Sequence, residues 1–186
     1  MLNCDMGVSK SAAIGRSALD EERMAEIVDF TAKTLSSDRP VPFGASIVHT
    51  KTGKTLIRTV NAVARENDPS AHAELRAVRL ACRKLKSTSL AGYTLYSTCE
   101  PCPMCMASAL WARTDRVVYG ATIADAGHHC LQIHISAKRV AARSDMACVV
   151  EGPVLRKRCY ELFTHPNMLK AFSAWANRKP LGGSPN

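Results

Sequence analysis

Three candidate metal ligands, one histidine and two cysteines, constrain this chain more than any other feature of its sequence. The histidine belongs to His72-Ala73-Glu74, and the cysteines belong to Pro101-Cys102-Pro103-Met104-Cys105. Three protein ligands of this kind leave a tetrahedral zinc ion with one position open for water. The fold must therefore bring two distant segments together around one zinc ion, bound by His72, Cys102 and Cys105. Glu74 then stands beside the ion, where it can carry protons.

Each part of this pattern has a more ordinary explanation when it is taken alone. A histidine at a helix start is most often a structural residue, and a glutamate there is usually a solvated charge. A C-x-x-C pair can be a redox couple or half of a structural zinc site. A structural zinc needs a fourth protein ligand, for which Cys99 is the nearest candidate. The joint occurrence of all these residues at two helix starts favours a hydrolytic zinc site.

The composition is that of an ordinary globular chain. With 186 residues, of which 46% are hydrophobic, the chain is long enough for one domain with a buried core. We expect a loose leader over 1–18 and a single domain over 19–186. No apolar run reaches the roughly 18 residues of a membrane span, and the N-terminus lacks the layout of a secretory signal. These observations predict a cytoplasmic protein.

The net charge of +9 is high for a small-molecule enzyme and is also compatible with a nucleic-acid partner. Solvated helix faces are the simpler interpretation of the basic residues. Aromatic residues make up only 5% of the chain, so platforms for base stacking are not obvious. Beyond the two assigned to zinc, we interpret the cysteines as buried small hydrophobes or inert thiols rather than disulfides.

Hydrophobic periodicity predicts alternating helices and strands. An amphipathic helix is expected over 21–35, with Asp20 as its cap, followed by strands over 45–48 and 55–60 that are joined by a turn at Gly53. The other expected elements are a loop over 61–70, a helix from Asp68-Pro69 to Leu85, a strand over 94–98, a helix from Pro101 or Pro103 to Ala112, strands over 116–119 and 147–151, and helices over 154–163 and 168–175. This order predicts an α/β fold in which a five-stranded mixed sheet opens with an antiparallel hairpin. The site is expected where two helix N-termini meet at the edge of the sheet.

The chain resembles the cytidine deaminase superfamily, and within it most closely the bacterial guanine deaminases. H-x-E with P-C-x-x-C is a known signature of zinc deaminases that act on bases. The resemblance covers 42–124 firmly and implies a three-layer α-β-α cytidine deaminase-like fold. The matching stretches are Pro42-Phe43-Gly44-Ala45, Asn67 to Glu74, Thr98 to Cys105, Trp111-Ala112-Arg113 and Val118-Tyr119-Gly120-Ala121.

The chemistry of such a site is hydrolytic loss of ammonia. Zinc lowers the pKa of its bound water toward about 7, and the resulting hydroxide attacks an amidine carbon of a heteroaromatic ring. Glu74 takes the proton from water and delivers it to a ring nitrogen and to the departing ammonia. The resemblance further implies substrate contacts and a second proton carrier. The substrate contacts are Asn61, Phe43 and Ala73, and the second proton carrier is Asp125.

Two of these residues have alternatives that the sequence leaves open. Asn61 is equally suited to a turn, and Asp125 to a loop or helix cap. The chain also departs from guanine deaminases over 126–130, where those enzymes carry a Gly-Phe-Asp-Asp-like stretch. A second metal at His128, His129 and Cys130 is disfavoured, because adjacent histidines point in different directions, and His134 is interpreted as structural. The stretch 171–177 resembles the guanine deaminase tail, which can exchange between subunits, although Trp175 also suits a simple apolar anchor.

The leading functional hypothesis is deamination of guanine to xanthine. Close variants act on cytosine, guanosine or a triazine. The main rival is a tRNA adenosine deaminase acting on the anticodon loop, a family that usually has Leu where this chain has Cys99. Cys99 and Asp125 therefore favour the free base. A zinc-stabilised nucleic-acid-binding module without activity is a further alternative, and the resemblance implies a homodimer.

Overall fold

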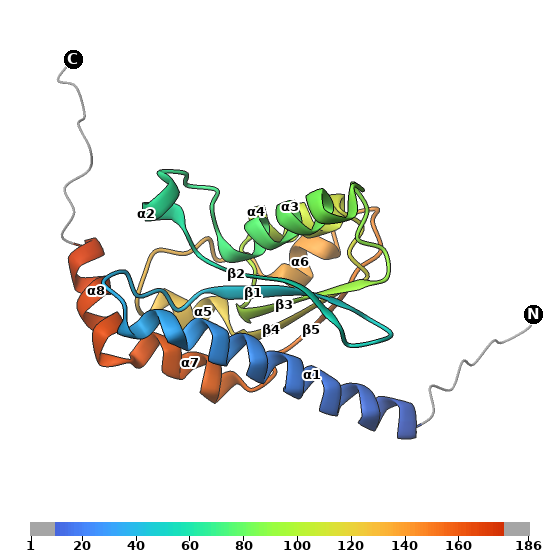
Figure 1. Cartoon of the computed structure of the whole chain (residues 1–186), viewed down its shortest axis with the longest axis horizontal. Coiled ribbons are helices and arrows are strands. Elements are labelled where there is room, and N and C mark those ends of the chain that lie inside the picture. Colours follow the sequence, from blue (N-terminus) through green and yellow to red (C-terminus); the bar gives the residue numbers. More distant parts are fainter. Residues whose placement is uncertain (1–9, 177–186) are drawn as a thin grey trace, which may run out of the picture.

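The structure, a computed structural model, describes residues 10–176, with side chains from residue 17 onward (Figure 1). A five-stranded sheet lies between two layers of helices, which confirms the predicted three-layer fold. In chain order the elements are α1 (Lys10–Ala32), the 3-10 helix η1 (Lys33–Ser36), β1 (Gly44–His49), β2 (Thr55–Val60), α2 (Val63–Glu66), α3 (Ala73–Leu85), β3 (Tyr93–Cys99), α4 (Pro103–Trp111), β4 (Arg116–Ala121), α5 (Ile123–Gly127), α6 (Ala137–Ala141), β5 (Val149–Glu151), α7 (Arg156–Thr164) and α8 (Pro166–Ala176).

The sheet has the strand order β2-β1-β3-β4-β5, with β3 at its centre. Strand β1 pairs antiparallel with both β2 and β3, whereas β3, β4 and β5 run parallel. The β1–β2 turn contains Gly53 at φ +66°, a left-handed conformation that glycine adopts without steric cost. The opening hairpin and the mixed sheet are therefore as predicted.

Both faces of the sheet are covered, so neighbouring residues of one strand enter different cores. Leu95 and Val117 pack in the core beneath α3, α4 and α6. Tyr96 and Val118 pack in the core with α1, α7 and α8. A parallel sheet buried on both faces needs apolar side chains at successive positions, which explains the short apolar runs of β3 and β4. Among the described helices, none is long and apolar enough to span a bilayer.

The first helix is longer than predicted. It begins at Lys10, so residues 10–18 are helical rather than part of a loose leader, while 1–9 lie outside the described residues. Adding a residue to an existing helix costs little, and no proline interrupts the segment, so helix continues even without an apolar repeat. The predicted apolar face is confirmed. Its buried members are Met24, Ile27, Val28 and Thr31 on α1 and Leu35 on η1.

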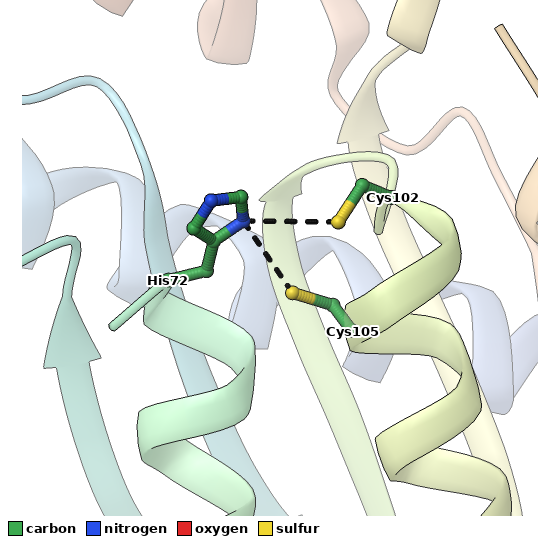
Figure 2. A group of neighbouring side chains, drawn as sticks. All are labelled: His72, Cys102 and Cys105. Carbon is green, nitrogen blue, oxygen red and sulfur yellow. Dashed lines mark hydrogen bonds between the residues drawn. The ribbon is translucent and has the colours of Figure 1, made fainter. Parts of the chain in front are cut away.

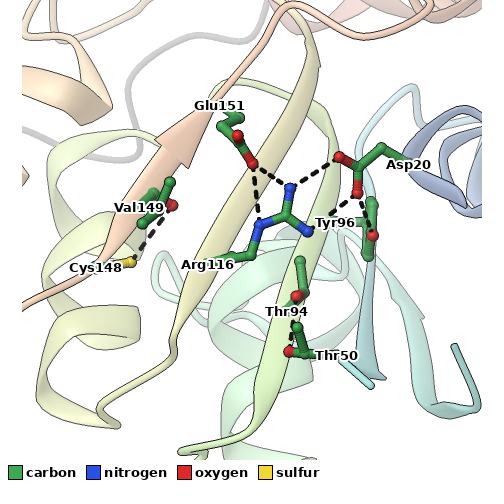
Figure 3. A network of polar contacts seen from close by, with 8 residues as sticks. All are labelled: Asp20, Thr50, Thr94, Tyr96, Arg116, Cys148, Val149 and Glu151. Carbon is green, nitrogen blue, oxygen red and sulfur yellow. Dashed lines mark hydrogen bonds and ion pairs between the residues drawn. The ribbon is translucent and has the colours of Figure 1, made fainter. Parts of the chain in front are cut away.

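Asp20 does not cap this helix, which corrects the prediction. It lies within α1, and its carboxylate accepts hydrogen bonds from the Tyr96 hydroxyl at 2.6 Å and from Arg116 at 2.8 Å (Figure 3). Arg116 also bonds to Glu151 on β5. A buried guanidinium requires paired carboxylates, and Asp20 supplies one of them. The local pattern suggested a cap because the partners of Asp20 lie in distant strands.

Helix α3 begins later than the sequence indicated. Asp68-Pro69 forms a turn instead, in which the Asp68 carboxylate accepts from the backbone and hydroxyl of Ser70 at 2.8 and 2.7 Å. The short helix α2 precedes this turn inside the predicted loop. As a result the helix starts at Ala73, and His72 becomes its N-cap residue with extended backbone. This small shift places His72 beside the helix end rather than inside the first turn.

Candidate active site

The three predicted ligands meet where α3 and α4 begin (Figure 2). His72 is the N-cap residue of α3, Cys102 is the N-cap residue of α4, and Cys105 lies in the first turn of α4. Pro103 opens α4, a position where its missing N–H removes no helical hydrogen bond. The site follows the carboxyl end of β3, so it lies at the end of the central strand rather than at an outer strand.

The spacing of the three ligand atoms fits a zinc ion. His72 Nδ1 lies 3.7 Å from the Sγ of Cys102 and 3.6 Å from the Sγ of Cys105. Zn–S bonds of about 2.3 Å and Zn–N bonds of about 2.05 Å at a tetrahedral angle put sulfur and nitrogen about 3.6 Å apart. Within residues 10–176 this is the group of potential ligands that could hold a metal, and Cys99 is not part of it. Three protein ligands favour an open fourth position and one zinc ion per chain.

The two cysteines share protons in a way that suits metal binding. Hydrogen bonds with Cys105 and then with His72 lower the pKa of Cys102 below its usual value. The pKa of Cys105 is raised above its usual value, because its thiol hydrogen bonds to Cys102 and is buried. The surroundings of Cys102 therefore favour its thiolate form. Zinc takes thiolate ligands, so a cation can replace the shared protons.

Glu74 lies one residue into α3 and is 5% exposed. Burial raises the pKa of this carboxyl to about 7. Glu74 is not part of the ligand group, but it lines the same cavity as His72 and Cys102. A carboxyl group with these properties can hold a proton or release it near neutral pH.

The metal centre opens into a cavity of about 130 Å³. Phe43 and Asn61 line it, as the resemblance implied. The Asn61 side chain also accepts a hydrogen bond from the Val63 N–H at 3.1 Å, so the residue both shapes a turn and borders the cavity. The full lining is Phe43, Asn61, His72, Glu74, Cys99, Glu100, Cys102, Cys130, Leu131 and Gln132.

Ala73 and Gln132 differ from expectation in opposite ways. Ala73 is fully buried and is not among the lining residues. Its carbonyl oxygen accepts a hydrogen bond from Thr59 at 2.7 Å. Gln132 and its neighbour Leu131 line the cavity, although the sequence singled out neither. The only signal was the departure from guanine deaminases just before them, at 126–130.

Asp125 is not on the cavity wall. It closes a capping box with Thr122 at the start of α5, and both of its oxygens accept hydrogen bonds from Arg156, at 2.7 and 2.9 Å. These bonds, with Arg156 the largest cause, hold the pKa of the carboxyl well below its usual range. A group that stays ionised cannot accept a proton near neutral pH. The geometry thus supports the cap interpretation of Asp125 and does not support a second proton carrier.

The histidines after α5 do not form a second ligand group. His129 stacks on Phe172, with ring centroids 5.3 Å apart, and its Nε2 lies 3.0 Å from the Tyr160 hydroxyl. His134 is exposed. Within residues 10–176 the cysteines form no disulfide bond. Trp175 packs edge-on against Phe172 at 5.2 Å, which supports its interpretation as an anchor, whereas Asn177 lies outside the described residues.

The fold and the site together define a cytidine deaminase-like zinc protein. The protein-family model for the cytidine and deoxycytidylate deaminase zinc-binding region matches residues 18–121 of the chain. This match includes the strands β1 to β4 and all three metal ligands. The chain belongs to this family.

Known relatives include deaminases of two kinds. The chain is 47% identical over 85 residues to the guanine deaminase of Bacillus subtilis, covering 46% of this chain and 53% of that protein. It is 40% identical over 90 residues to the tRNA-specific adenosine deaminase of Aquifex aeolicus, covering 48% and 58%. The matched part thus spans little more than half the length of either relative.

A solved structure shares the fold over most of both chains. The guanine deaminase of Nitrosomonas europaea superimposes with a TM-score of 0.69, covering 83% of this chain and 84% of its own. The two chains are 23% identical, so this similarity concerns the fold alone.

Proposed function

We propose that this protein is a zinc-dependent hydrolytic deaminase of a free purine base, with guanine as the leading substrate. Water replaces the amino group of guanine, which yields xanthine and ammonia. The observation that carries the proposal is a buried Glu74 in the same small cavity as His72 and Cys102, two members of a three-ligand group that fits a zinc ion. The cavity volume of about 130 Å³ lies below the roughly 300–1,000 Å³ of pockets for larger ligands, which favours a single planar base.

Six residues of the site have a defined task in this proposal. His72, Cys102 and Cys105 hold the zinc ion, which supplies a Lewis acid that lowers the pKa of water toward about 7. Glu74 accepts the proton of the attacking water and passes it to a ring nitrogen and then to the leaving amino group. Asn61 offers its side-chain amide to the edge of the base, and Phe43 borders the ring.

A second candidate is deamination of a base within a nucleotide or RNA. A groove of about 490 Å³ adjoins the cavity and shares Asn61 and His72 with it. Trp175, Arg39 and Arg65 also line this groove. Aromatic and arginine side chains suit stacking and phosphate contacts, and the net charge of +9 agrees with them. The relative that acts on tRNA adds weight to this candidate.

A homodimer forms part of the proposal. Several large apolar side chains are exposed, and such patches on a folded protein typically mark interfaces. Trp111 is 76% exposed and borders the same groove as Ile135, which is 41% exposed. Light scattering of the wild type and of Trp111→Ser tests this surface. A wild-type monomer at micromolar concentration contradicts it.

Ammonia release from a panel of substrates tests the proposed activity. The panel contains guanine, guanosine, cytosine, adenosine, a triazine and a tRNA anticodon stem-loop. We expect turnover of guanine that disappears in Glu74→Gln. Turnover of the stem-loop but not of guanine makes the second candidate correct. Absence of ammonia from every member of the panel, with zinc bound, refutes the proposed function.

A further inference from the structure

One carboxylate beside the metal centre has contacts that the proposed reaction does not use. Glu100 follows β3 directly, two residues before Cys102, and it borders the cavity although it is only 8% exposed. Its backbone N–H donates to the carbonyl oxygen of Ala121 at 2.7 Å, which joins the ends of β3 and β4. The sheet therefore fixes the place from which the Glu100 side chain extends.

Both oxygens of this carboxylate accept backbone N–H groups, each from a different helix. Oε2 accepts from Ile123, the first residue of α5, at 3.2 Å. Oε1 accepts from Ala137, the first residue of α6, at 2.9 Å. Both donor residues are buried, and a buried N–H without a partner is costly. One side chain thus joins the starts of two helices to the strand that leads into the metal centre.

The loop between these helices, residues 128–136, forms part of the cavity wall. Cys130, Leu131 and Gln132 all line the cavity, and the Gln132 amide donates to the Cys130 sulfur at 3.3 Å. The loop contains no helix or strand. Its position therefore depends on how its two ends are held.

The two ends of this loop are held by different means. At its start, His129 stacks on Phe172 and lies within hydrogen-bond distance of Tyr160. At its end, the N–H of Ala137 is bound by Glu100. The side chains over 131–136 are mostly exposed, so they add little packing to this second attachment. At this end the loop is therefore restrained by the Glu100 contact together with the packing of Ala137, which is fully buried at the start of α6.

We propose that Glu100 is a positioning residue, which fixes the 128–136 loop as a wall of the cavity and so determines how the base is held. It acts through Cys130, Leu131 and Gln132 and not on the reacting atoms. The nature of the base rests on the proposed function, whereas the restraint on the loop does not. Loss of the restraint should weaken substrate binding more than it slows the chemical step.

Two substitutions at Glu100 and one control test this role. Glu100→Gln keeps the shape and one acceptor oxygen but turns an amide NH₂ toward the other N–H, and Glu100→Ala removes both acceptors. Glu151→Gln is the control, because Glu151 also bonds to a buried partner, Arg116, but on the opposite face of the sheet. The measurements are zinc content, hydrogen exchange along the chain, and kcat and KM on the best base of the panel.

We expect both Glu100 variants to keep one zinc ion. Their backbone amides over 128–136 should exchange hydrogen faster than those of the wild type, and the increase should be larger in Glu100→Ala than in Glu100→Gln. KM should rise by about tenfold or more while kcat stays within about threefold, the signature of lost ground-state binding. The Glu151→Gln control should leave loop exchange and KM unchanged.

Three results overturn the proposal: unchanged exchange over 128–136, loss of zinc, or faster exchange spread equally over the sheet. If the wild type deaminates no base at all, the proposed function fails, and hydrogen exchange still decides the role of Glu100.

Discussion

The Nδ1 atom of His72 lies 3.6 Å from the Sγ atom of Cys105, although 33 positions separate the two residues in the chain. Two helices that start side by side on one face of the sheet make this distance possible. Each helix contributes ligands from its first residues, where side chains project beyond the helix end. The packing of α3 against α4 therefore fixes the positions of the ligands relative to one another.

Zinc content should fall when one of the three ligands is replaced, but not when another cysteine is replaced. We expect about one zinc ion per wild-type chain, and a loss of most of it in Cys102→Ser or His72→Ala, because two remaining ligands bind weakly. Cys99→Ser is the matched control, since Cys99 borders the cavity but lies outside the ligand group. Elemental analysis after dialysis gives the stoichiometry. Full zinc occupancy in Cys102→Ser contradicts the assignment.

Metal removal should also lower the thermal stability. A ligand that binds only the folded state at 100 times its dissociation constant adds about 2.7 kcal/mol to the free energy of unfolding. Chelation of the wild type should therefore lower its melting temperature, and added zinc should restore it. The same treatment should leave Cys102→Ser almost unchanged, which calorimetry can check.

Glu74→Gln should keep zinc but lose turnover. Glutamine preserves the shape of the side chain but cannot shuttle a proton, and a positioned acid–base group contributes about 10²–10⁴-fold to rate. Ammonia release should fall by that factor at constant zinc content. Glu161→Gln, at an exposed position of α7, serves as the control and should match the wild type. Turnover of Glu74→Gln within a few-fold of wild type would remove Glu74 from the proposed role.

Asp125→Asn should affect stability rather than turnover. Its pKa is lowered in the folded state, so its contribution to stability is present above the unfolded pKa of about 3.9 and is lost as pH falls below that value. We expect a loss of about 1 kcal/mol at pH 7, typical of a disrupted cap. Urea unfolding at pH 7 and pH 3 should show this difference shrinking at the lower pH. A fall in turnover of 100-fold or more would restore Asp125 as a proton carrier.

Two aspartates on α1 should differ sharply in their importance. Asp20→Ala leaves Arg116 buried without its main partner, and such a loss costs about 3–5 kcal/mol (Figure 3). Asp29→Ala removes an exposed pair with Arg158, which is worth at most about 1 kcal/mol. Urea unfolding of both variants gives the two values. Equal losses would contradict the structural role assigned to Asp20.

The sequence predicted best where the physical cause is local. The apolar repeat from Met24 to Leu35 predicted a buried helix face, and Gly53 predicted the first hairpin turn. Prediction from the sequence failed where residues that are distant in the chain bind a side chain that also suits a local role. Asp20 has the chemistry of a cap, but Arg116 and Tyr96 bind it.

The same division applies to the candidate site. His72, Cys102, Cys105 and Glu74 were identifiable because zinc chemistry requires those residue types, and their spacing is recognisable without a structure. The rest of the cavity wall, beyond Phe43 and Asn61, could not be identified, because no chemical rule links Glu100 or Gln132 to the zinc ligands along the chain.

By itself the sequence determined the ligand set, the candidate proton carrier and the order of the five strands and the longer helices, since these follow from residue chemistry and local periodicity. Only the tertiary structure decided that Asp125 caps a helix and pairs with Arg156, and that Glu100 accepts the N–H groups of Ile123 and Ala137. The reason is physical. A carboxylate bonds to whichever donors the fold brings near it, and those donors come from segments that are distant in the chain.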